Sequence, residues 1–444
     1  MPNRSMAGVP APAPAVDWDE VLAEVVSTLR EYLRIDTSNP PGEEERAARF
    51  LGEILEREGF AVEYVEAAPG RMSLRTVLRG SGDAAPLMLL NHSDVVPVQR
   101  EFWDVDPFAG IEKDGCIWGR GALDMKGMGI LELVVMLLFK RLGMVPRRDL
   151  IFLTVADEET GSSQGMEWLD QHRPAWLREP EYALNEGDAA SLNLFGAQRP
   201  VFPCAPSEKG PLWVTLHARG RPGHGSVPHD DNAVDRLVRA LGAIQSWDRA
   251  TSIDPMVQRT VDDLQRGRAW GDWRPDAEEL SARHPSFGPL LKDTISCTGL
   301  GGGFKHNVIP ADARATLDCR LLPGQSHDAF LAEMREVIDD DRIEISTQLR
   351  SESGASDFDT ELVDVIRDVV GEQVEGAIVV PLPTRGFTDS RVLRRRGVQT
   401  YGFVPALMDA SLAAGVHGHN ERIPVEGLRT GVQILFEVVR RFTA

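Results

Sequence analysis

Two short apolar runs constrain the fold of this chain more than any other feature. Residues 87–90 are Leu-Met-Leu-Leu, and residues 150–155 are apolar at all but one position. Such runs suit β-strands that are buried on both faces. Apolar residues recur at helical spacing over 18–33, 43–58 and 130–142. Helices alternating with buried strands predict an α/β fold, a layered sandwich around a largely parallel central sheet.

A different pattern begins near Pro211. Residues 212–218 alternate apolar with polar side chains, as a half-exposed strand does. The order that follows is strand, helix, strand, strand, helix, strand, which is the order of a split βαβ unit with its helices on one face. The chain has 444 residues, which favours two domains. We therefore predict a large domain over 17–210 and 351–444, with a domain of residues 211–350 inserted into it.

The composition limits the classes of partner. The formal net charge is −20, which argues against binding to nucleic acid or to an anionic membrane. The apolar stretch at residues 130–139 contains Glu132 and is too short to span a bilayer. Residues 1–16 are rich in Ala and Pro and lack the apolar core of a secretion signal, so we expect a disordered tail. No two of the four cysteines form a Cys-x-x-Cys pair, which favours reduced thiols and a cytoplasmic protein.

The candidate chemistry lies just after the predicted buried strands, where ligands gather in open α/β sheets. His92 follows the strand at 87–90, and in an extended segment Asp94 lies on the same side of the chain. A ligating imidazole usually donates its second N–H to a carboxylate, and Asp94 is placed for that role. Taken alone, His92 could equally be a core histidine.

Carboxylates occur in two further turns. Asp124 lies in the glycine-rich stretch 119–127 before a predicted helix, where a lone Asp is more often an N-cap than a ligand. Residues 157–159 are three consecutive carboxylates directly after the strand at 150–155. They repel one another, and a metal pair would stabilise them, with one residue as ligand and another as base. The alternative is an acidic turn in contact with solvent.

Two more positions complete the pattern. Glu186 follows a short apolar run at 182–184, and His417 lies near the end of the chain, close to His419. Carboxylates and imidazoles together suit Zn²⁺ or a similar divalent ion, not a soft thiolate site. Their joint occurrence predicts a metal centre, although no single position is specific.

Over residues 18–440 the sequence resembles a known family. It is similar to the zinc metallopeptidases that include aminoacylases, carboxypeptidase G, carboxypeptidase S, dipeptidases and succinyl-diaminopimelate desuccinylase. Residues 157–159, Glu186-Gly187 and His417-x-x-Asn420-Glu421 follow in the family order. The signature segments are His92-Ser93-Asp94-Val95-Val96-Pro97, Trp103, Asp106-Pro107-Phe108, Asp114-Gly115, Trp118-Gly119-Arg120-Gly121 and Asp124-Met125-Lys126-Gly127.

The resemblance implies a catalytic α/β domain with two zinc ions and an inserted ferredoxin-like lid that mediates homodimerisation. Co²⁺ or Mn²⁺ could substitute for zinc. The residues that resemble the ligands of one zinc are His92, Asp124 and Glu186. Those that resemble the ligands of the other are Asp124, Glu159 and His417, so that Asp124 would bridge the pair.

Other residues resemble catalytic and substrate-binding groups of the family. Glu158 resembles the general base, and Asp94 resembles the carboxylate behind His92. His224 resembles a lid histidine that reaches the substrate, often in the partner's active site. The remaining candidates for substrate binding are Asn307, Arg320 and Arg391. Arg320 could instead be a strand-edge charge and Arg391 a cation on a helix surface.

The resemblance implies hydrolysis of an amide bond beside a free amino-acid carboxylate, in a small molecule or a short peptide. The sequence does not separate an N-acyl amino acid from a dipeptide or a peptide C-terminus. A non-catalytic binding protein is disfavoured because all five ligand positions and Glu158 are present. The glycine run at 299–303 lacks a following P-loop Lys-Ser/Thr, so we interpret it as a loop and not a nucleotide site. The polar stretch 248–289, inside the predicted lid, could cover or reshape the cleft.

Overall fold

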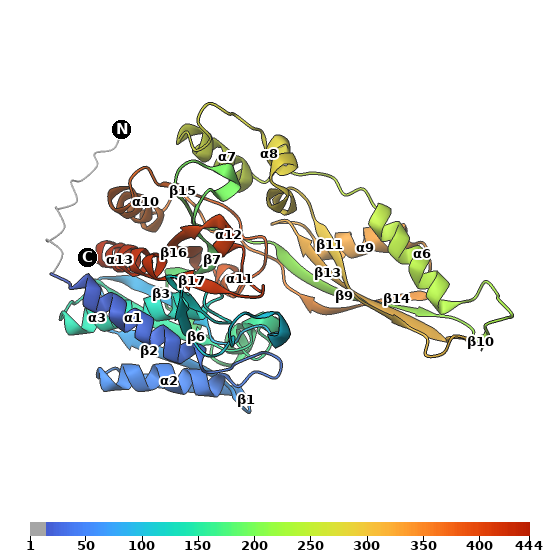
Figure 1. Ribbon diagram of the computed structural model, residues 1–444, viewed down its shortest axis with the longest axis horizontal. Helices are drawn as coiled ribbons and strands as arrows, with labels where there is room; N and C mark the ends of the chain where they lie inside the picture. The colour runs from blue at the N-terminus through green and yellow to red at the C-terminus, as the bar shows by residue number, and fades with distance from the viewer. Residues whose placement is uncertain (1–14) are drawn as a thin grey trace.

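The computed structural model describes residues 15–444 and contains two domains (Figure 1). The large domain is built on an eight-stranded sheet, and the small domain on a four-stranded sheet that extends away from it. This is the predicted two-domain α/β architecture. Apart from Ala15 and Val16, the expected N-terminal tail lies outside the described residues.

The large sheet combines parallel and antiparallel pairs. Strand β3 pairs in parallel with β6 and β7, and β16 pairs in parallel with β7. Strands β1 and β2 form an antiparallel hairpin that adds to β6, and β8 adds antiparallel to β7 and parallel to β15. The sheet is therefore mixed. In sheet order the strands are β1 (Val62–Ala68), β2 (Arg71–Leu78), β6 (Arg148–Val155), β3 (Ala84–His92), β7 (Tyr182–Leu192), β8 (Val201–Pro203) and β15 (Ile378–Val380), with β16 (Gln399–Asp409) beside β7.

Side-chain alternation in β3 and β6 explains why both strands are almost purely apolar. Leu87 and Leu89 belong to one core cluster, and Met88 and Leu90 belong to another on the opposite face of the sheet. The first face is covered by α1 (Trp18–Leu33), α2 (Glu44–Arg57), α3 (Lys126–Arg141), α10 (Glu361–Gln373) and α13 (Val425–Phe442). The second is covered by α4 (Met166–His172), α5 (Ala175–Arg178) and α11 (Ser390–Arg395).

The small domain has the ferredoxin-like strand order. Its four strands are all antiparallel, in the order β11 (Thr294–Gly302), β13 (Asp312–Leu321), β9 (Gly210–Arg219), β14 (Ile343–Arg350). Helices α6 (Ala233–Ser246) and α9 (His327–Ile338) share one apolar core with the sheet. The glycine run expected to be a loop is strand as far as Gly302. A two-stranded ribbon, β10 (Gly223–His224) with β12 (Val308–Ile309), lies at the end of this domain farthest from the large domain (Figure 1).

The stretch 248–289 packs on the large domain. It contains α7 (Pro255–Arg266) and α8 (Ala277–Arg283), followed by the short helix η4 (Pro285–Leu290). Their apolar side chains share a cluster with β8 and β15 at the edge of the large sheet. Arg259 of α7 forms an ion pair with Asp359, 2.6 Å between Nη2 and Oδ1. The stretch thus covers one edge of the large sheet. The exact domain limits at 211 and 350 stay a prediction.

Smaller elements complete the described chain. A three-stranded sheet consists of β4 (Ile111–Lys113), β5 (Cys116–Trp118) and β17 (Arg422–Pro424). Within residues 15–444, no helix combines the length and the hydropathy needed to cross a membrane. The remaining short elements are α12 (Ala410–Ala413), η1 (Arg100–Phe102), η2 (Glu158–Thr160) and η3 (Leu194–Gly196).

Candidate metal centre

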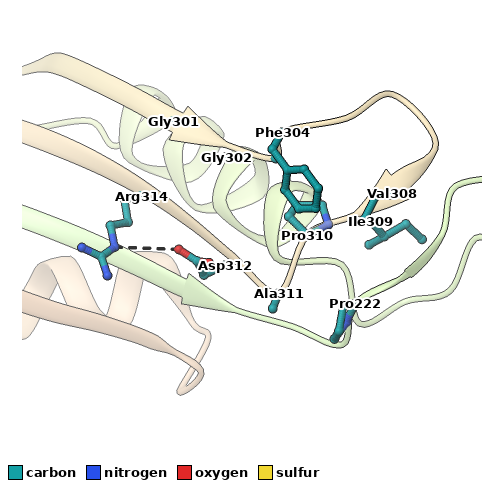
Figure 2. Close-up of a pocket in the computed structure, with 11 residues that line it drawn as sticks. Pro222, Gly301, Gly302, Phe304, Val308, Ile309, Pro310, Ala311, Asp312 and Arg314 are labelled. Atoms are coloured by element: carbon teal, nitrogen blue, oxygen red, sulfur yellow. Dashed lines mark ion pairs between the residues drawn. The ribbon is translucent and has the colours of Figure 1, made fainter.

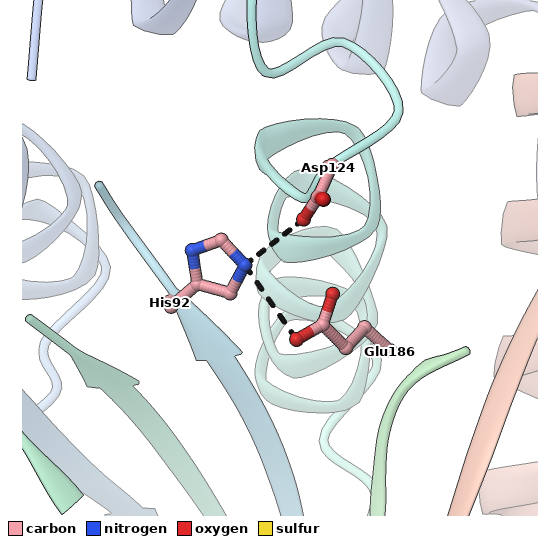
Figure 3. Close-up of side chains that lie close together, drawn as sticks. All are labelled: His92, Asp124 and Glu186. Atoms are coloured by element: carbon pink, nitrogen blue, oxygen red, sulfur yellow. Dashed lines mark hydrogen bonds and ion pairs between the residues drawn. The ribbon is translucent and has the colours of Figure 1, made fainter. Parts of the chain in front are cut away.

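His92 ends strand β3 and faces two carboxylates (Figure 3). Its Nε2 lies 3.0 Å from Oδ1 of Asp124 and 3.6 Å from Oε1 of Glu186. On the other side of the ring, Nδ1 lies 3.0 Å from the backbone oxygen of Asp94 and 3.5 Å from its carboxylate. With Nδ1 donating to Asp94, Nε2 is the nitrogen available to a cation. The ring therefore faces a group of carboxylates that could share a cation with it.

A second group of the same kind forms around His417. Its Nε2 lies 3.1 Å from Oδ2 of Asp124 and 3.2 Å from Oε2 of Glu159. Asp124 thus faces one histidine with each of its carboxylate oxygens. In both groups the potential ligand atoms lie within 4.8 Å of one another. All five residues predicted as ligands come together in these two groups, with Asp124 shared between them.

Asp124 is held by a buried glutamate on a distant segment. Glu421 is fully buried, and its carboxylate accepts backbone N–H bonds from Gly121, Leu123 and Asp124 at 2.7–3.2 Å. Helix α3 starts only at Lys126, without a side-chain cap. Asp124 is therefore not the N-cap that its position allowed, and its side chain is left to face the histidines.

The same glutamate connects the two loops that carry ligands. Arg120 donates to Glu421 at 2.5 Å and to the backbone oxygen of Gly418 at 3.0 Å. Pairing of β17 with β5 fixes Glu421 next to the 119–124 loop. Arg120 and Glu421 belong to the motifs quoted above, but their bracing role was missed. Their separation of 301 residues hides it in the sequence.

Asp94 also fixes the turn that follows β6. Its carboxylate accepts the backbone N–H groups of Glu158 and Glu159, each at 3.1 Å. Asp157 points elsewhere, because its carboxylate binds Arg71 at 2.6 Å. Of three consecutive carboxylates, the turn therefore presents two to the site. Glu158 is only 6% exposed, so the alternative of a solvated acidic turn is excluded.

The two histidines compensate only part of the cost of burying the three glutamates of the site. Burial, with the charge of Glu186 added, raises the pKa of Glu158 well above its usual value. Burial and the neighbouring Asp124 raise the pKa of Glu159 to about 7 and that of Glu186 to about 8. One oxygen of each of these three glutamates is buried without a hydrogen-bond partner among residues 15–444.

The histidines respond in the opposite direction. Burial lowers the pKa of His92, but the charges and hydrogen bonds of Glu186, Asp124 and Asp94 raise it well above the usual value. Hydrogen bonds to Asp124 and Glu159 raise the pKa of His417 to about 10. The site therefore attracts positive charge. Together with the oxygen and imidazole donors, this is the environment that a pair of divalent cations requires.

A cleft of about 770 Å³ adjoins both groups. It is lined by Glu158 and four of the five potential ligands, by Arg320 and Trp213 of the small domain, and by residues 384–388. The stretch 248–289 contributes His284 and Ser286 to the lining. Arg320 is held by Asp318, with Nε and Nη2 at 2.6 and 2.9 Å from the carboxylate. The structure thus places Arg320 at the cleft.

The other three predicted substrate contacts do not line this cleft. His224 and Asn307 are exposed on and beside the β10–β12 ribbon at the far end of the small domain. Nδ1 of His224 accepts from the backbone N–H of Ser226 at 3.2 Å. Arg391 is fully buried, and its guanidinium donates to the backbone oxygens of Thr388 and Gly161 at 2.7 and 3.1 Å. It is therefore neither a helix-surface cation nor part of the cleft wall.

Comparison with known proteins decides the family. The sequence model of peptidase family M20/M25/M40 matches residues 88–441. The chain belongs to this family. Aminoacylase-1 of Sus scrofa is 28% identical over 426 residues, covering 93% of this chain and 94% of the relative. An N-fatty-acyl-amino acid synthase/hydrolase of Xenopus tropicalis is 28% identical over 440 residues, covering 94% and 85%.

Solved structures of the M20 family share the fold. A di-peptidase of Saccharomyces cerevisiae superposes with a TM-score of 0.74 at 16% identity, covering 96% of this chain and 97% of that one. A dinuclear metal binding peptidase of Bacillus subtilis gives a TM-score of 0.58 at 12% identity, covering 96% and 99%. The protein is thus an M20 enzyme that uses metal to hydrolyse amide bonds, as the sequence predicted.

Proposed function

We propose that this M20 enzyme hydrolyses N-acyl amino acids, releasing a carboxylic acid and a free amino acid. The observation that carries the proposal is the shared carboxylate. Asp124 faces His92 with one oxygen and His417 with the other, and Glu158 lines the same cleft. This arrangement supports two cations side by side next to one general base. Two-metal sites of this kind are suited to hydrolysis at a carbonyl.

We propose zinc as the metal, with Co²⁺ or Mn²⁺ as substitutes. One ion would be held by His92, Asp124 and Glu186, and the other by Asp124, Glu159 and His417. Nitrogen and oxygen donors in groups of three are typical of catalytic zinc, which keeps a position open for water or substrate. When bound, the ions supply Lewis acidity and lower the pKa of a water molecule toward neutrality.

Glu158 is proposed to move the proton of the reaction. Its carboxylate is buried and has an oxygen without a hydrogen-bond partner among the described residues. It would accept a proton from the attacking water and donate it to the amine that leaves. Asp94 orients this step indirectly, because it fixes the backbone N–H groups of Glu158 and Glu159.

Charges in the cleft favour an acyl substrate over a dipeptide. Arg320 lines the cleft, and among the described residues Asp318 binds only its Nε and Nη2, so Nη1 is left to donate to the free carboxylate of the amino acid. The α-ammonium of a dipeptide would need a carboxylate in the same cleft. Apart from Glu158 and the potential metal ligands, the carboxylate in the lining is Asp188, and it is already paired with Arg385 at 2.5 Å. An uncharged acyl group has no such requirement.

Apolar residues in the lining of the cleft support the same preference. They come from the first two turns of α3, from β16 and from the segment around α12. An aliphatic or aromatic acyl group could be buried there, which a charged amino terminus could not without a partner. The residues concerned are Met128, Leu131, Val404, Ala406, Met408, Ala413 and Ala414. A dipeptide is the second candidate, because Oδ2 of Asp188 is buried without a partner among the described residues.

We further propose that the enzyme acts as a homodimer through the small domain. His224 is exposed far from the cleft of its own chain, so it would stabilise the developing oxyanion only in the site of a second copy. Asn307 lies beside it and would act in the same way. Strand β11 is an edge strand of the described sheet and carries Leu300, 66% exposed. An exposed apolar edge of this kind is suited to pairing with a second copy.

A hollow at the tip of the small domain borders the same edge (Figure 2). It has a volume of about 500 Å³ and is lined by glycines 301–303, Phe304 and residues 308–312. Phe304 is 82% exposed, the most exposed large apolar side chain among the described residues. Burial of Phe304 and of this hollow against a second copy would remove apolar surface from water, which supports the proposed dimer.

The cytoplasmic location stays a prediction. It is supported by the four cysteines, all of which lie in the described part of the chain and are unpaired. Cys116, Cys204 and Cys319 are buried, and Cys297 is exposed. Free thiols persist in a reducing compartment.

The proposed substrate class is tested by release of free amino acid from two matched panels. One panel holds N-acetyl, N-butyryl and N-octanoyl derivatives of one amino acid, and the other holds dipeptides with that amino acid at the C-terminus. We expect kcat/KM for the best acyl derivative to exceed that for the best dipeptide by at least about 10-fold. Preference for dipeptides by a similar factor would replace the acyl proposal with the second candidate.

A further inference from the structure

The turn that carries Glu158 is held in an unusual backbone conformation. Asp157, Gly161 and Ser162 have φ values of 68°, 100° and 65°. Two of these residues are not glycine, and L-residues adopt this left-handed region only when their surroundings enforce it. Internal hydrogen bonds close the turn, from Ser162 N–H to Asp157 at 2.6 Å and from Gly161 N–H to Glu158 at 2.9 Å. These bonds do not orient the turn relative to the metal centre, so its orientation must depend on contacts with other segments of the chain.

Helix α11 and its N-cap residue Asp389 supply those contacts, from a segment more than 200 residues away in the sequence. The hydroxyl of Ser162 donates to Oδ1 of Asp389 in a short hydrogen bond. The guanidinium of Arg391 donates from Nη2 to the backbone oxygen of Gly161, at 3.1 Å. Asp389 and Arg391 are both almost fully buried. The end of the turn is therefore fixed at two adjacent points by one helix.

The same helix also contacts the strand that carries Glu186. The side chain of Asn185 donates to the hydroxyl of Ser390 at 2.9 Å. The start of α11 thus touches both elements that bring glutamates to the metal centre. By contrast, Arg391 is separated from the cleft by Phe387, which lines the cleft and packs on the guanidinium with 4.9 Å between Cζ and the ring centre. A direct contact of Arg391 with substrate is incompatible with this position.

We propose that Asp389 and Arg391 are positioning residues, which hold the Glu158 turn in the orientation that proton transfer requires. The inference rests on the proposed role of Glu158 as general base. It replaces the role in substrate binding that the family resemblance implied for Arg391. A displaced base lowers the rate of the chemical step, while binding of substrate by Arg320 and the metal ligands is preserved.

The test compares Arg391→Met and Ser162→Ala with a matched control, Arg394→Lys. Arg394 lies on the same helix and is buried, but it donates to the backbone oxygens of Ala205 and Thr400 and not to the turn. For each variant, kcat and KM are measured on the best acyl substrate, together with metal content and thermal unfolding. Ser162→Ala removes the hydrogen bond to Asp389 with little change in volume, so it serves if Arg391→Met does not fold.

We expect kcat to fall about 10²-fold in Arg391→Met and about 10-fold in Ser162→Ala, with KM within about twofold and the metal content unchanged. Arg394→Lys should keep the wild-type kcat even if its unfolding temperature drops. A rise in KM at constant kcat in Arg391→Met would overturn the proposal and return Arg391 to substrate binding. An equal loss of kcat in Arg394→Lys would overturn it as well, because the effect would then reflect damage to the helix.

Glu158→Gln is measured in parallel to separate the two proposals. If Glu158→Gln is inactive and Arg391→Met has wild-type kcat, the positioning role alone fails. If Glu158→Gln is as active as wild type, the base assignment fails, and the positioning role fails with it.

Discussion

The metal centre and the β10–β12 ribbon differ in how their residues are arranged, although the family resemblance predicted functional residues in both. At the metal centre, five potential ligands and Glu158 converge within one chain, and all of them except His417 are at least partly buried. At the ribbon, His224 and Asn307 are exposed, and neither lines the cleft that adjoins the metal centre. The difference teaches that the potential metal ligands assemble within one chain, whereas the proposed substrate contacts at the ribbon would need the cleft of a second copy.

Among the predicted variants, replacement of the proposed general base, Glu158, should lower activity the most. Glu158→Gln keeps the size of the side chain but cannot accept a proton, so we expect kcat to fall about 10²–10⁴-fold. Metal content should stay at the wild-type value, because Glu158 belongs to neither ligand group. Steady-state kinetics with elemental analysis checks both. Activity within a few-fold of wild type, with metal retained, would remove the base assignment.

The next effect should come from the ribbon. His224→Ala leaves the metal centre intact and removes the proposed oxyanion donor, so we expect kcat to fall about 10²–10³-fold. The matched control is His229→Ala, which alters a histidine in the same loop outside the ribbon. It should keep near wild-type activity.

Mixing two inactive variants sharpens the comparison. If His224 acts in the site of the second copy, a heterodimer of Glu158→Gln and His224→Ala contains one intact site. After subunit exchange we expect recovery of up to about a quarter of wild-type activity, since half of the dimers are mixed and each has one working site. Absence of recovery, with heterodimers shown by mass spectrometry, would contradict action of His224 across the dimer.

A smaller effect is expected from the brace of the metal centre. Glu421→Gln weakens the bond to Arg120 and the hold on the backbone of the 121–124 loop. We expect metal affinity to drop about 10–100-fold, with wild-type kcat restored at saturating metal. Titration of the metal-free protein followed by activity measures this. An unchanged affinity would show that the loop keeps Asp124 in place without Glu421.

The smallest predicted effect is a change in the preference between acyl substrates and dipeptides. Arg385→Gln removes the partner of Asp188 and leaves a carboxylate in the cleft to bind an ammonium group. We expect kcat/KM for dipeptides to rise about 10-fold relative to acyl substrates. The two substrate panels described above measure the ratio. A ratio that does not move would exclude the Asp188–Arg385 pair as the reason for the acyl preference.

The sequence predicted what local pattern and motif order can encode. The apolar runs at β3 and β6 correctly indicated strands buried on both faces, because alternate side chains there enter two separate cores. The five potential ligands, which the structure brings together, were predicted from carboxylates and imidazoles beside those strands and from the family order. The ferredoxin-like order of the small domain followed from its sequence of elements, since each crossover helix packs on the same face.

What the sequence could not predict depends on contacts between distant segments. Burial of Arg391 follows from the packing of α11 against the Glu158 turn, and no local pattern reveals it. The polar appearance of 248–289 concealed an apolar stripe that covers β8 and β15. The antiparallel pairs of the large sheet depend on the β1–β2 hairpin and on the short strand β8, neither of which leaves a parallel or antiparallel signature in the residues.

The account's central claim is that two metal ions share Asp124, and elemental analysis of three proteins tests it most directly. We expect about two divalent ions per chain in the wild type, about one in His417→Ala and fewer than one in Asp124→Ala, because only Asp124 belongs to both groups. Circular dichroism would confirm that each variant is folded. Two ions retained in folded Asp124→Ala, or a single ion in the active wild type, would contradict the shared-carboxylate centre.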